Sequence, residues 1–176
     1  QADLFLHSPV IGAQTEKNRI CALNCVDDEG MFEIRAKAFV DASGDANLAR
    51  LAGAKVMWGD AQGRVQAASL PFRLSGVDIT KDMSPAAVKC AVEQARNAGM
   101  EHLPRESGFL LTLEGSQVVC ALIPSVMPEG LSARELTRME QELREQAVSY
   151  AAALKRYMPG MEHSELVMIG PSIGLR

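Results

Sequence analysis

The sequence contains no long apolar run and no concentration of positive charge. No apolar stretch approaches the roughly 18 residues that a helix needs to cross a bilayer, so we expect no membrane partner. Lysine and arginine are scattered singly along a chain whose formal net charge is −4, which argues against nucleic acid as a partner. These absences predict a soluble, cytoplasmic protein.

Cysteine is also scarce. The four cysteines form neither a CxxC pair nor a ligand cluster with the three histidines (Cys21, Cys25, Cys90 and Cys120; His7, His102 and His163). We therefore predict no metal site, and reduced core cysteines of a cytoplasmic protein are the favoured interpretation. His102 and His163 follow glutamates in loop-like contexts, where solvated side chains are favoured.

The length of 176 residues and the hydrophobic content of 47% fit one globular domain or somewhat more. The chain starts with Gln1 almost inside a strand pattern, and it ends on Arg176 without a polar tail. We therefore expect a piece excised from a longer protein.

The first quarter of the chain has a β-type pattern over residues 3–42. Leu4 and Leu6 begin a first run that breaks near Pro9, a turn follows at 16–18, and residues 20–26 form a mostly buried strand. Residues 27–30 carry a hairpin signal. The next strand continues into a final buried strand at 39–40, which completes an antiparallel meander. No apolar face in the sequence backs this meander, so a missing N-terminal part is expected to cover it.

The remainder mixes strands and helices. Residues 64–78 read as one strand with Pro71 at an edge or bulge, because proline cannot donate to a ladder. Ser84 and Pro85 begin a helix that buries Val88, Ala91, Val92 and Ala95 and ends near residue 99. Strands at 108–113 and 117–123 flank a hairpin turn at 114–116, and a last strand covers 165–169.

The longest predicted helix covers residues 133–158. Ser132 and Glu135 form a capping box at its start, and Pro159-Gly160 ends it. Apolar residues recur along it at three- and four-residue steps: Leu136, Met139, Leu143, Ala147, Tyr150, Leu154 and Tyr157. Packing of this stripe on a sheet is favoured over a coiled-coil seam.

A corner of small residues separates the meander from a two-turn helix at 47–53. Ser43, Gly44 and Asp45 are residue types that turn tightly and cap helices. A strand that runs into such a corner and then a helix is a usual place to hold a phosphate or a ribose. Asp45 would repel a phosphate and suits a hydroxyl-rich group or an N-cap. An ordinary strand–turn–helix connection is the alternative interpretation.

The corner also carries a family resemblance. Residues 40–49, with 52–54, resemble the (I/V)-D-A-(T/S)-G-D-x-x-L-A…A-G-A segment of FAD-dependent oxidoreductases that have a glutathione-reductase-like FAD domain. More narrowly, they resemble the bacterial FAD-dependent oxidoreductase family that is distantly related to fumarate reductase flavoproteins. Three further stretches agree in the same order. Residues 66–78 are similar to Q-x-x-(S/T)-L-x-F-R-L-x-G-V-D, 136–144 to L-T-x-x-E-x-x-x-R, and 173–176 to the start of I-G-(V/L)-R-E-(T/S)-R.

The resemblance implies an α/β fold with α+β character. An antiparallel meander and the last strand of a FAD domain would occupy residues 1–57, and a mixed sheet-and-helix substrate domain would occupy 58–176. The family's G-x-G-x-x-G loop and its ribose-binding acidic residue are expected N-terminal to Gln1, and a closing segment is expected beyond Arg176. The chain's partners would then include these missing parts. By itself the chain is expected to bind no FAD and to be inactive.

The resemblance also implies site residues. Ser43, Gly44 and Asp45 would lie beside the pyrophosphate and ribose of FAD, and Gln66 and Ser69 would lie near the isoalloxazine ring. Arg176 would bind an anionic substrate, because a guanidinium group grips carboxylates with two hydrogen bonds. The catalytic acid or base is unknown from the sequence.

The intact protein is accordingly expected to transfer a hydride between FAD and a small organic substrate, with a carboxylate as one candidate. A non-catalytic α/β binding or assembly module, with the long helix as its partner surface, is the alternative. A flavoprotein fold used for tRNA modification or in a structural role is a further alternative, against which the acidic charge weighs. The position of the apolar helix stripe distinguishes the module from the enzyme, because a binding module needs that stripe exposed for a partner.

Overall fold

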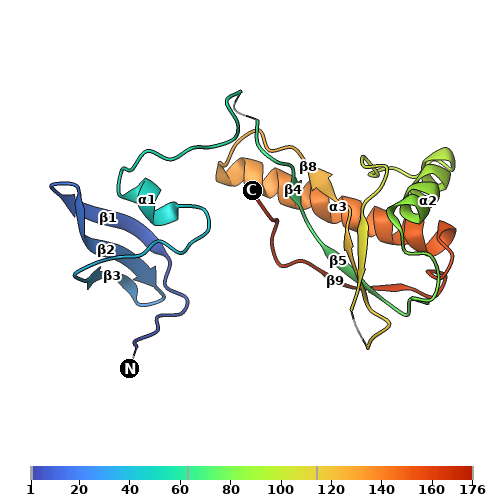
Figure 1. Cartoon of the computed structure of the whole chain (residues 1–176), viewed down its shortest axis with the longest axis horizontal. Helices are drawn as coiled ribbons and strands as arrows, with labels where there is room; N and C mark the ends of the chain where they lie inside the picture. The colour runs from blue at the N-terminus through green and yellow to red at the C-terminus, as the bar shows by residue number, and fades with distance from the viewer. Residues whose placement is uncertain (1, 63, 114, 176) are drawn as a thin grey trace. The chain divides into compact units, whose positions relative to one another are not determined.

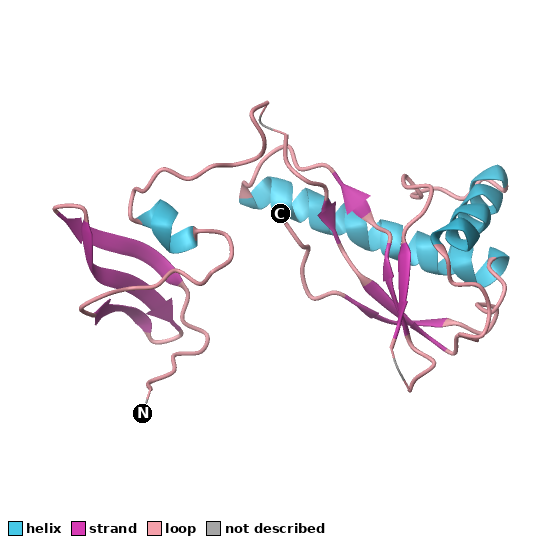
Figure 2. Cartoon of the chain, viewed as in Figure 1, coloured by secondary structure: helices cyan, strands magenta, loops and turns pink. Residues whose placement is uncertain are grey.

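The computed structural model describes residues 2–62, 64–113 and 115–175. The chain forms two compact units, Gln1–Gly59 and Asp60–Arg176, each described by itself below (Figure 1). Helices and antiparallel sheets together give the α+β character that the sequence predicts (Figure 2). Among the described helices, none is both long and apolar enough to span a bilayer.

The first unit is built on the predicted antiparallel meander. Its strands are β1 (Val10–Glu16), β2 (Arg19–Asp27) and β3 (Gly30–Arg35), in the order β1-β2-β3. Lys17 and Asn18, with φ of 48° and 64°, make the two-residue turn between β1 and β2 in a conformation that matches strand twist. The Asp27 carboxylate closes the next turn by accepting from the N–H groups of Glu29 and Gly30 at 2.9 and 3.1 Å.

Two predicted strand segments of this unit are not strands. Residues 2–9, which include Leu4 and Leu6, and residues 36–42, which include Val40, join no ladder in the described chain. An extended segment becomes a strand only when a neighbour takes its backbone hydrogen bonds in a continuous ladder. The described bonds to the backbone of these two segments are isolated: the Pro9 carbonyl accepts from the Val26 N–H group at 3.2 Å, and the Lys37 carbonyl accepts from the Arg19 side chain at 2.6 Å. Their apolar side chains are exposed, for example Leu4 at 79% and Val40 at 89%.

Burial in the meander is also lower than predicted. Only Ala22 and Cys25 of β2 are buried, so the strand is half-exposed rather than mostly buried. All four cysteines are free thiols, but Cys90 is exposed and Cys21 and Cys120 are partly exposed. The core interpretation is therefore right for Cys25 alone. Burial raises the pKa of the Cys25 thiol.

The second unit contains a four-stranded antiparallel sheet and a two-stranded ladder. The sheet has the order β6-β7-β5-β9, and β4 pairs with β8. The bounds are β4 (Ala68–Ser69), β5 (Phe72–Ser75), β6 (Phe109–Thr112), β7 (Val119–Leu122), β8 (Ser125–Val126) and β9 (Glu165–Ile169). The predicted hairpin of β6 and β7 and the last strand are confirmed; Glu114, in the predicted hairpin turn, lies outside the described residues.

Pro71 divides the strand that was predicted over residues 64–78. Strand β4 ends before it, β5 begins after it, and the two belong to different ladders. Proline has no N–H group to donate, so a ladder cannot run through it unbroken. Its carbonyl accepts from the N–H group of Gly170 at 2.8 Å. The single continuous strand is wrong: the interruption expected at Pro71 is present as a break between two strands, rather than as a bulge or an edge within one.

Two helices cover the sheet, α2 (Pro85–Asn97) and α3 (Ala133–Tyr157). Both begin at the predicted serine caps: Ser84 Oγ accepts from the Ala87 N–H group at 3.3 Å and Ser132 Oγ from that of Glu135 at 3.2 Å. Only the serine half of the predicted capping box is formed. The Glu135 carboxylate accepts from the N–H group of Glu129, at 3.2 Å, instead of returning to Ser132.

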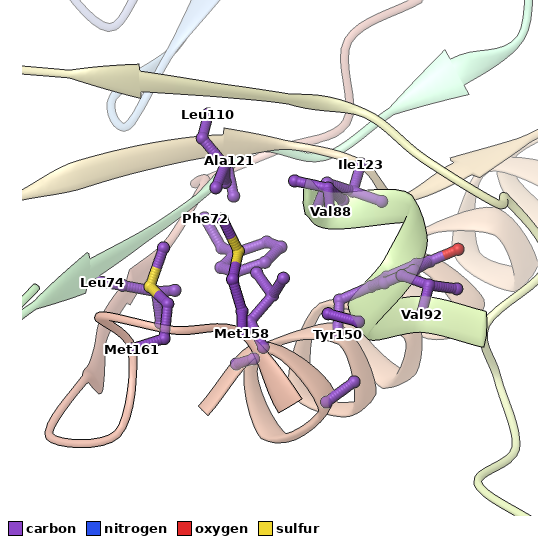
Figure 3. Packing of buried hydrophobic residues seen from close by; sticks show 14 of the residues in the cluster. Phe72, Leu74, Val88, Val92, Leu110, Ala121, Ile123, Tyr150, Met158 and Met161 are labelled. Carbon is purple, nitrogen blue, oxygen red and sulfur yellow. The ribbon is translucent and has the colours of Figure 1, made fainter. Parts of the chain in front are cut away.

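The core of this unit lies between the sheet and the two helices (Figure 3). Figure 3 shows Phe72 of β5, Val92 of α2 and Tyr150 of α3 together, each 1% exposed or less. Five residues of the predicted α3 stripe are buried: Met139, Leu143, Ala147, Tyr150 and Leu154. The stripe thus packs within its own chain, against the sheets as predicted and also against α2.

Candidate functional site

Asp41 organises the small-residue corner of the first unit. One carboxylate oxygen of Asp41 accepts from the N–H group and the hydroxyl of Ser43, at 3.0 and 2.6 Å. The other accepts from the N–H group of Ala49 at 3.0 Å. Ser43 Oγ in turn accepts from the N–H group of Asn47, also at 3.0 Å. Asp41 and Ser43 therefore satisfy N–H groups at the start of the helix, which would otherwise lack partners.

The helix after the corner is shorter than predicted and is capped differently. Helix α1 (Asn47–Leu51) has five residues, and its N-cap position is Ala46, in a left-handed conformation with φ of 54°. Asp45 is exposed, and its side chain makes no hydrogen bond to any residue that the structure describes. The prediction that Asp45 could act as the N-cap is therefore wrong. The side chains that cap the helix are instead those of Ser43 and Asp41, which accept from the N–H groups of Asn47 and Ala49.

Gly44 gives the corner its shape. Its φ of +80° lies in the left-handed region, and no atom lies within 4 Å of where a Cβ would stand. The backbone conformation, rather than crowding, therefore requires glycine here.

The hydrogen bonds around Asp41 determine its charge. The hydroxyl of Ser43, followed by the backbone N–H groups of Ser43 and Ala49, lowers the pKa of Asp41 to about 2. The corner therefore carries a fixed negative charge at neutral pH. Sequence reasoning missed Asp41 as the organising residue, although aspartate two positions before serine is a recognisable turn signal.

The charge and the open space at this corner determine which ligand groups it suits. Asp41 already accepts from the backbone N–H groups that a phosphate would need, and its charge would repel the anion. The exposed Asp45 carboxylate, beside the open space at Gly44, is free of described partners and can accept from a hydroxyl. A corner of this charge suits a ligand hydroxyl better than a phosphate group.

The other predicted site residues belong to the second unit. Gln66 is exposed in the loop before β4, and Ser69 lies half-buried within β4. Ser69 exchanges two backbone hydrogen bonds with Gly174, of 2.8 and 3.1 Å. Arg176 lies outside the described residues. The roles of all six predicted site residues remain predictions.

Three of the four stretches that carry the family resemblance meet at Ser69. Ser69 comes from the stretch 66–78, and its partner Gly174 comes from 173–176. Glu140 and Arg144 come from 136–144, and they contact the backbone of residues 170–173 that leads to Gly174. No spacing in the sequence indicates this meeting. Among the described residues, no group of three or more His, Cys, Asp or Glu could hold a metal ion.

Comparison with known proteins defines the class. The model of the FAD dependent oxidoreductase family matches residues 1–176. The chain therefore belongs to the FAD dependent oxidoreductase family, as its motifs suggest.

A solved structure has a similar fold. A geranylgeranyl bacteriochlorophyll reductase-like protein from Thermoplasma acidophilum matches 95% of this chain with a TM-score of 0.50 and 16% identity. The chain spans only 36% of that protein, and at this identity the likeness concerns the fold alone. A search of curated protein sequences found no match.

Proposed function

We propose that this chain is part of a flavoprotein that transfers a hydride between FAD and a small organic substrate. The family match over the whole chain carries this proposal. When bound, FAD supplies the hydride chemistry, and the protein binds, orients and shields the reactants. Ser43, Gly44 and Asp45 hold a hydroxyl-bearing part of the cofactor, and Gln66 and Ser69 lie near its ring.

We propose further that the isolated chain binds no FAD and is inactive, because residues 1–176 contain no G-x-G-x-x-G loop to contact the pyrophosphate. The test compares the visible absorption spectra of the purified full-length protein and of the 176-residue chain. A flavin spectrum in the full-length protein alone supports both proposals. Absence of flavin from both would remove the first, and flavin in the short chain would remove the second.

The role of the corner is tested by Gly44→Val in the full-length protein. A branched side chain at φ of +80° strains the backbone by roughly 1–2 kcal/mol and fills the space beside Asp45. The matched control is Gly99→Val, where φ is +84° and the space is equally open, outside the proposed site. Flavin loss in Gly44→Val alone is the expected result. Unchanged flavin content would remove the corner from the site.

We propose a substrate with an apolar body and one anionic group. A row of paired residues crosses the sheet on one face: Leu111, Cys120, Arg73 and Met168. Leu111 and Met168 are 51% and 41% exposed, and Arg73 is exposed between them without a hydrogen bond to any described residue. A single guanidinium group within an apolar surface suits a carboxylate on an apolar molecule.

This substrate proposal is tested by bleaching of the flavin absorbance in the full-length protein with a panel of organic acids and their amides. Arg73→Met is expected to raise KM for the acids about tenfold or more and to leave the amides unaffected. Arg134→Met, an exposed arginine at the start of α3, serves as the control. Equal KM values for acids in the two variants would refute the assignment of Arg73.

The binding or assembly module is less well supported. It needs the stripe of α3 free for a partner, and Met139, Leu143 and Leu154 are fully buried within the chain.

We propose that the exposed apolar side chains of the first unit contact parts of the same protein outside residues 1–176. Leu4, Leu6, Met31 and Val40 are 67–89% exposed, which is unusual for apolar side chains gathered in one small unit. A dye that binds apolar surface is expected to fluoresce with the isolated chain and not with the full-length protein. Weak fluorescence from the isolated chain would contradict this proposal.

A further inference from the structure

The segment that follows β9 is held from two sides, although its described residues, 170–175, contain no helix and a single β-bridge. On one side lies the chain of β4. Gly170 donates its N–H to Pro71 at 2.8 Å, and Gly174 and Ser69 exchange hydrogen bonds of 2.8 and 3.1 Å. A Cβ on Gly170 would stand 3.3 Å from the carbonyl oxygen of Pro71, so the two backbones approach closely.

On the other side lies α3. The Glu140 carboxylate accepts from the N–H group of Ile173 at 3.1 Å. The Arg144 guanidinium donates to the carbonyls of Gly170 and Pro171 at 3.3 and 3.4 Å. These side-chain to backbone hydrogen bonds join residues that are 26 to 33 positions apart in the sequence. They satisfy backbone groups that a neighbouring strand would otherwise pair with.

Glu140 and Arg144 also bind each other. They are one helical turn apart, and Arg144 Nη2 donates to Glu140 Oε1 while Glu140 Oε2 is left for Ile173. Their side chains are 28% and 40% exposed. An exposed pair of this kind adds little stability by itself. Its structural consequence is that each side chain orients the other toward the segment.

Apolar contacts fix the same segment further. Ile173 and Leu175 pack against a small cluster below α3, which consists of Ala68, Leu70, Met139 and Leu143. The position of Gly174 opposite Ser69 therefore depends on α3 as well as on β4.

We propose that Glu140 and Arg144 are positioning residues of the flavoprotein site, which hold residues 170–174 against β4 and thereby fix Ser69. This inference rests on the proposed function, because it treats Ser69 as a residue near the flavin. Glu140 and Arg144 act through the Ser69–Gly174 pair and not by contact with cofactor or substrate.

The test uses the full-length flavoprotein. Glu140→Ala and Arg144→Met release the segment, whereas Glu140→Gln keeps an oxygen that can accept from Ile173. The control is Arg138→Met, since Arg138 makes ion pairs of 2.6 and 2.9 Å with Glu135 and Glu142 on the same helix and does not contact residues 170–174. Three quantities are measured: the flavin absorption spectrum, kcat and KM, and hydrogen exchange at the N–H groups of Ser69 and Gly174.

We expect Glu140→Ala and Arg144→Met to shift the flavin spectrum and to lower kcat/KM by about tenfold to a hundredfold, since small displacements near a reacting centre have such effects. Exchange at Ser69 and Gly174 is expected to rise about tenfold or more. Glu140→Gln is expected to restore most of the spectrum, of kcat/KM and of the slow exchange, and Arg138→Met to change none of the three.

Two outcomes overturn the inference, and they differ from failure of the proposed function. If exchange at Gly174 is the same in Glu140→Ala and Arg138→Met, the pair does not hold the segment. If exchange rises but the spectrum and kinetics do not change, the segment is held without positioning the site. A full-length protein without flavin would instead refute the proposed function, and with it a role at a flavin site.

Discussion

The side-chain amide of Gln146 donates to the carbonyl of Ser125 at 3.2 Å and accepts from the N–H group of the same residue at 2.9 Å. Gln146 is 1% exposed, among the buried residues of α3. It therefore pairs with β8 as a neighbouring strand would, and it satisfies backbone groups that would otherwise be buried without partners.

Replacing Gln146 by leucine should lower the free energy of unfolding by about 1–3 kcal/mol, because both backbone groups of Ser125 lose their partner. Urea unfolding measures the difference. Gln141→Leu, at an exposed position of the same helix, is the control and should have little effect. Equal stability of the two variants would show that Ser125 finds other partners.

Asp41→Asn should loosen the corner. The pKa of Asp41 lies below its ordinary value, at about 2, so its stabilisation is complete at neutral pH. This stabilisation is lost as the pH falls from the ordinary pKa of an aspartate to the lowered pKa of about 2, because the carboxylate then becomes protonated. Hydrogen exchange at the Ala49 N–H group should be faster in Asp41→Asn at pH 7, and in the unmodified protein it should accelerate over that acid range.

Asp45→Asn provides the comparison for Asp41→Asn. The Asp45 side chain has no described hydrogen-bond partner, so exchange at Ala49 should remain as in the unmodified protein. Faster exchange at Ala49 in both variants would mean that charge, rather than the hydrogen bonds of Asp41, holds the corner.

Ser132→Ala should destabilise the start of α3. The Ser132 hydroxyl accepts from the N–H group of Glu135, and loss of such a cap costs roughly 0.5–2 kcal/mol. Ser132→Asp keeps an acceptor oxygen and should retain most of the stability in thermal unfolding. The cap has no such role if alanine and aspartate lower the unfolding temperature equally.

Gly108→Ala should also be destabilising, for a steric reason. A Cβ at this position would stand 2.6 Å from the carbonyl oxygen of Leu122 and 3.0 Å from the Cα of Ile123, both of them backbone atoms at the end of the neighbouring strand β7. Relief of the clash requires a backbone shift that costs about 1–3 kcal/mol. Gly130→Ala, where the space is open, should change stability by less than about 0.5 kcal/mol. Similar unfolding free energies would contradict this account.

The elements predicted correctly are those that local signals define. The serine caps at Ser84 and Ser132 satisfy N–H groups within one turn of the helix, and the hairpin at residues 27–30 closes through Asp27. The apolar stripe of α3 follows from helical periodicity alone. Even the family was recognisable, because its motifs are short contiguous strings. In each case the interacting groups lie close together in the sequence.

The elements that the sequence could not define depend on neighbours far along the chain. Whether residues 39–40 form a strand depends on a partner strand, and which ladder follows Pro71 depends on the placement of β8 and β9. The same is true of the candidate site. Asp41 reaches eight residues forward to Ala49, and Glu140 reaches 33 residues to Ile173. The bond between Glu140 and Ile173 forms only because the packed core brings the two segments together, whereas Asp41 meets Ala49 through the left-handed turns at Gly44 and Ala46. The sequence by itself therefore determined α2, α3, their serine caps, the hairpin turns and the family, because these depend on groups close together in the chain. Tertiary packing decided which backbone groups meet at Ser69.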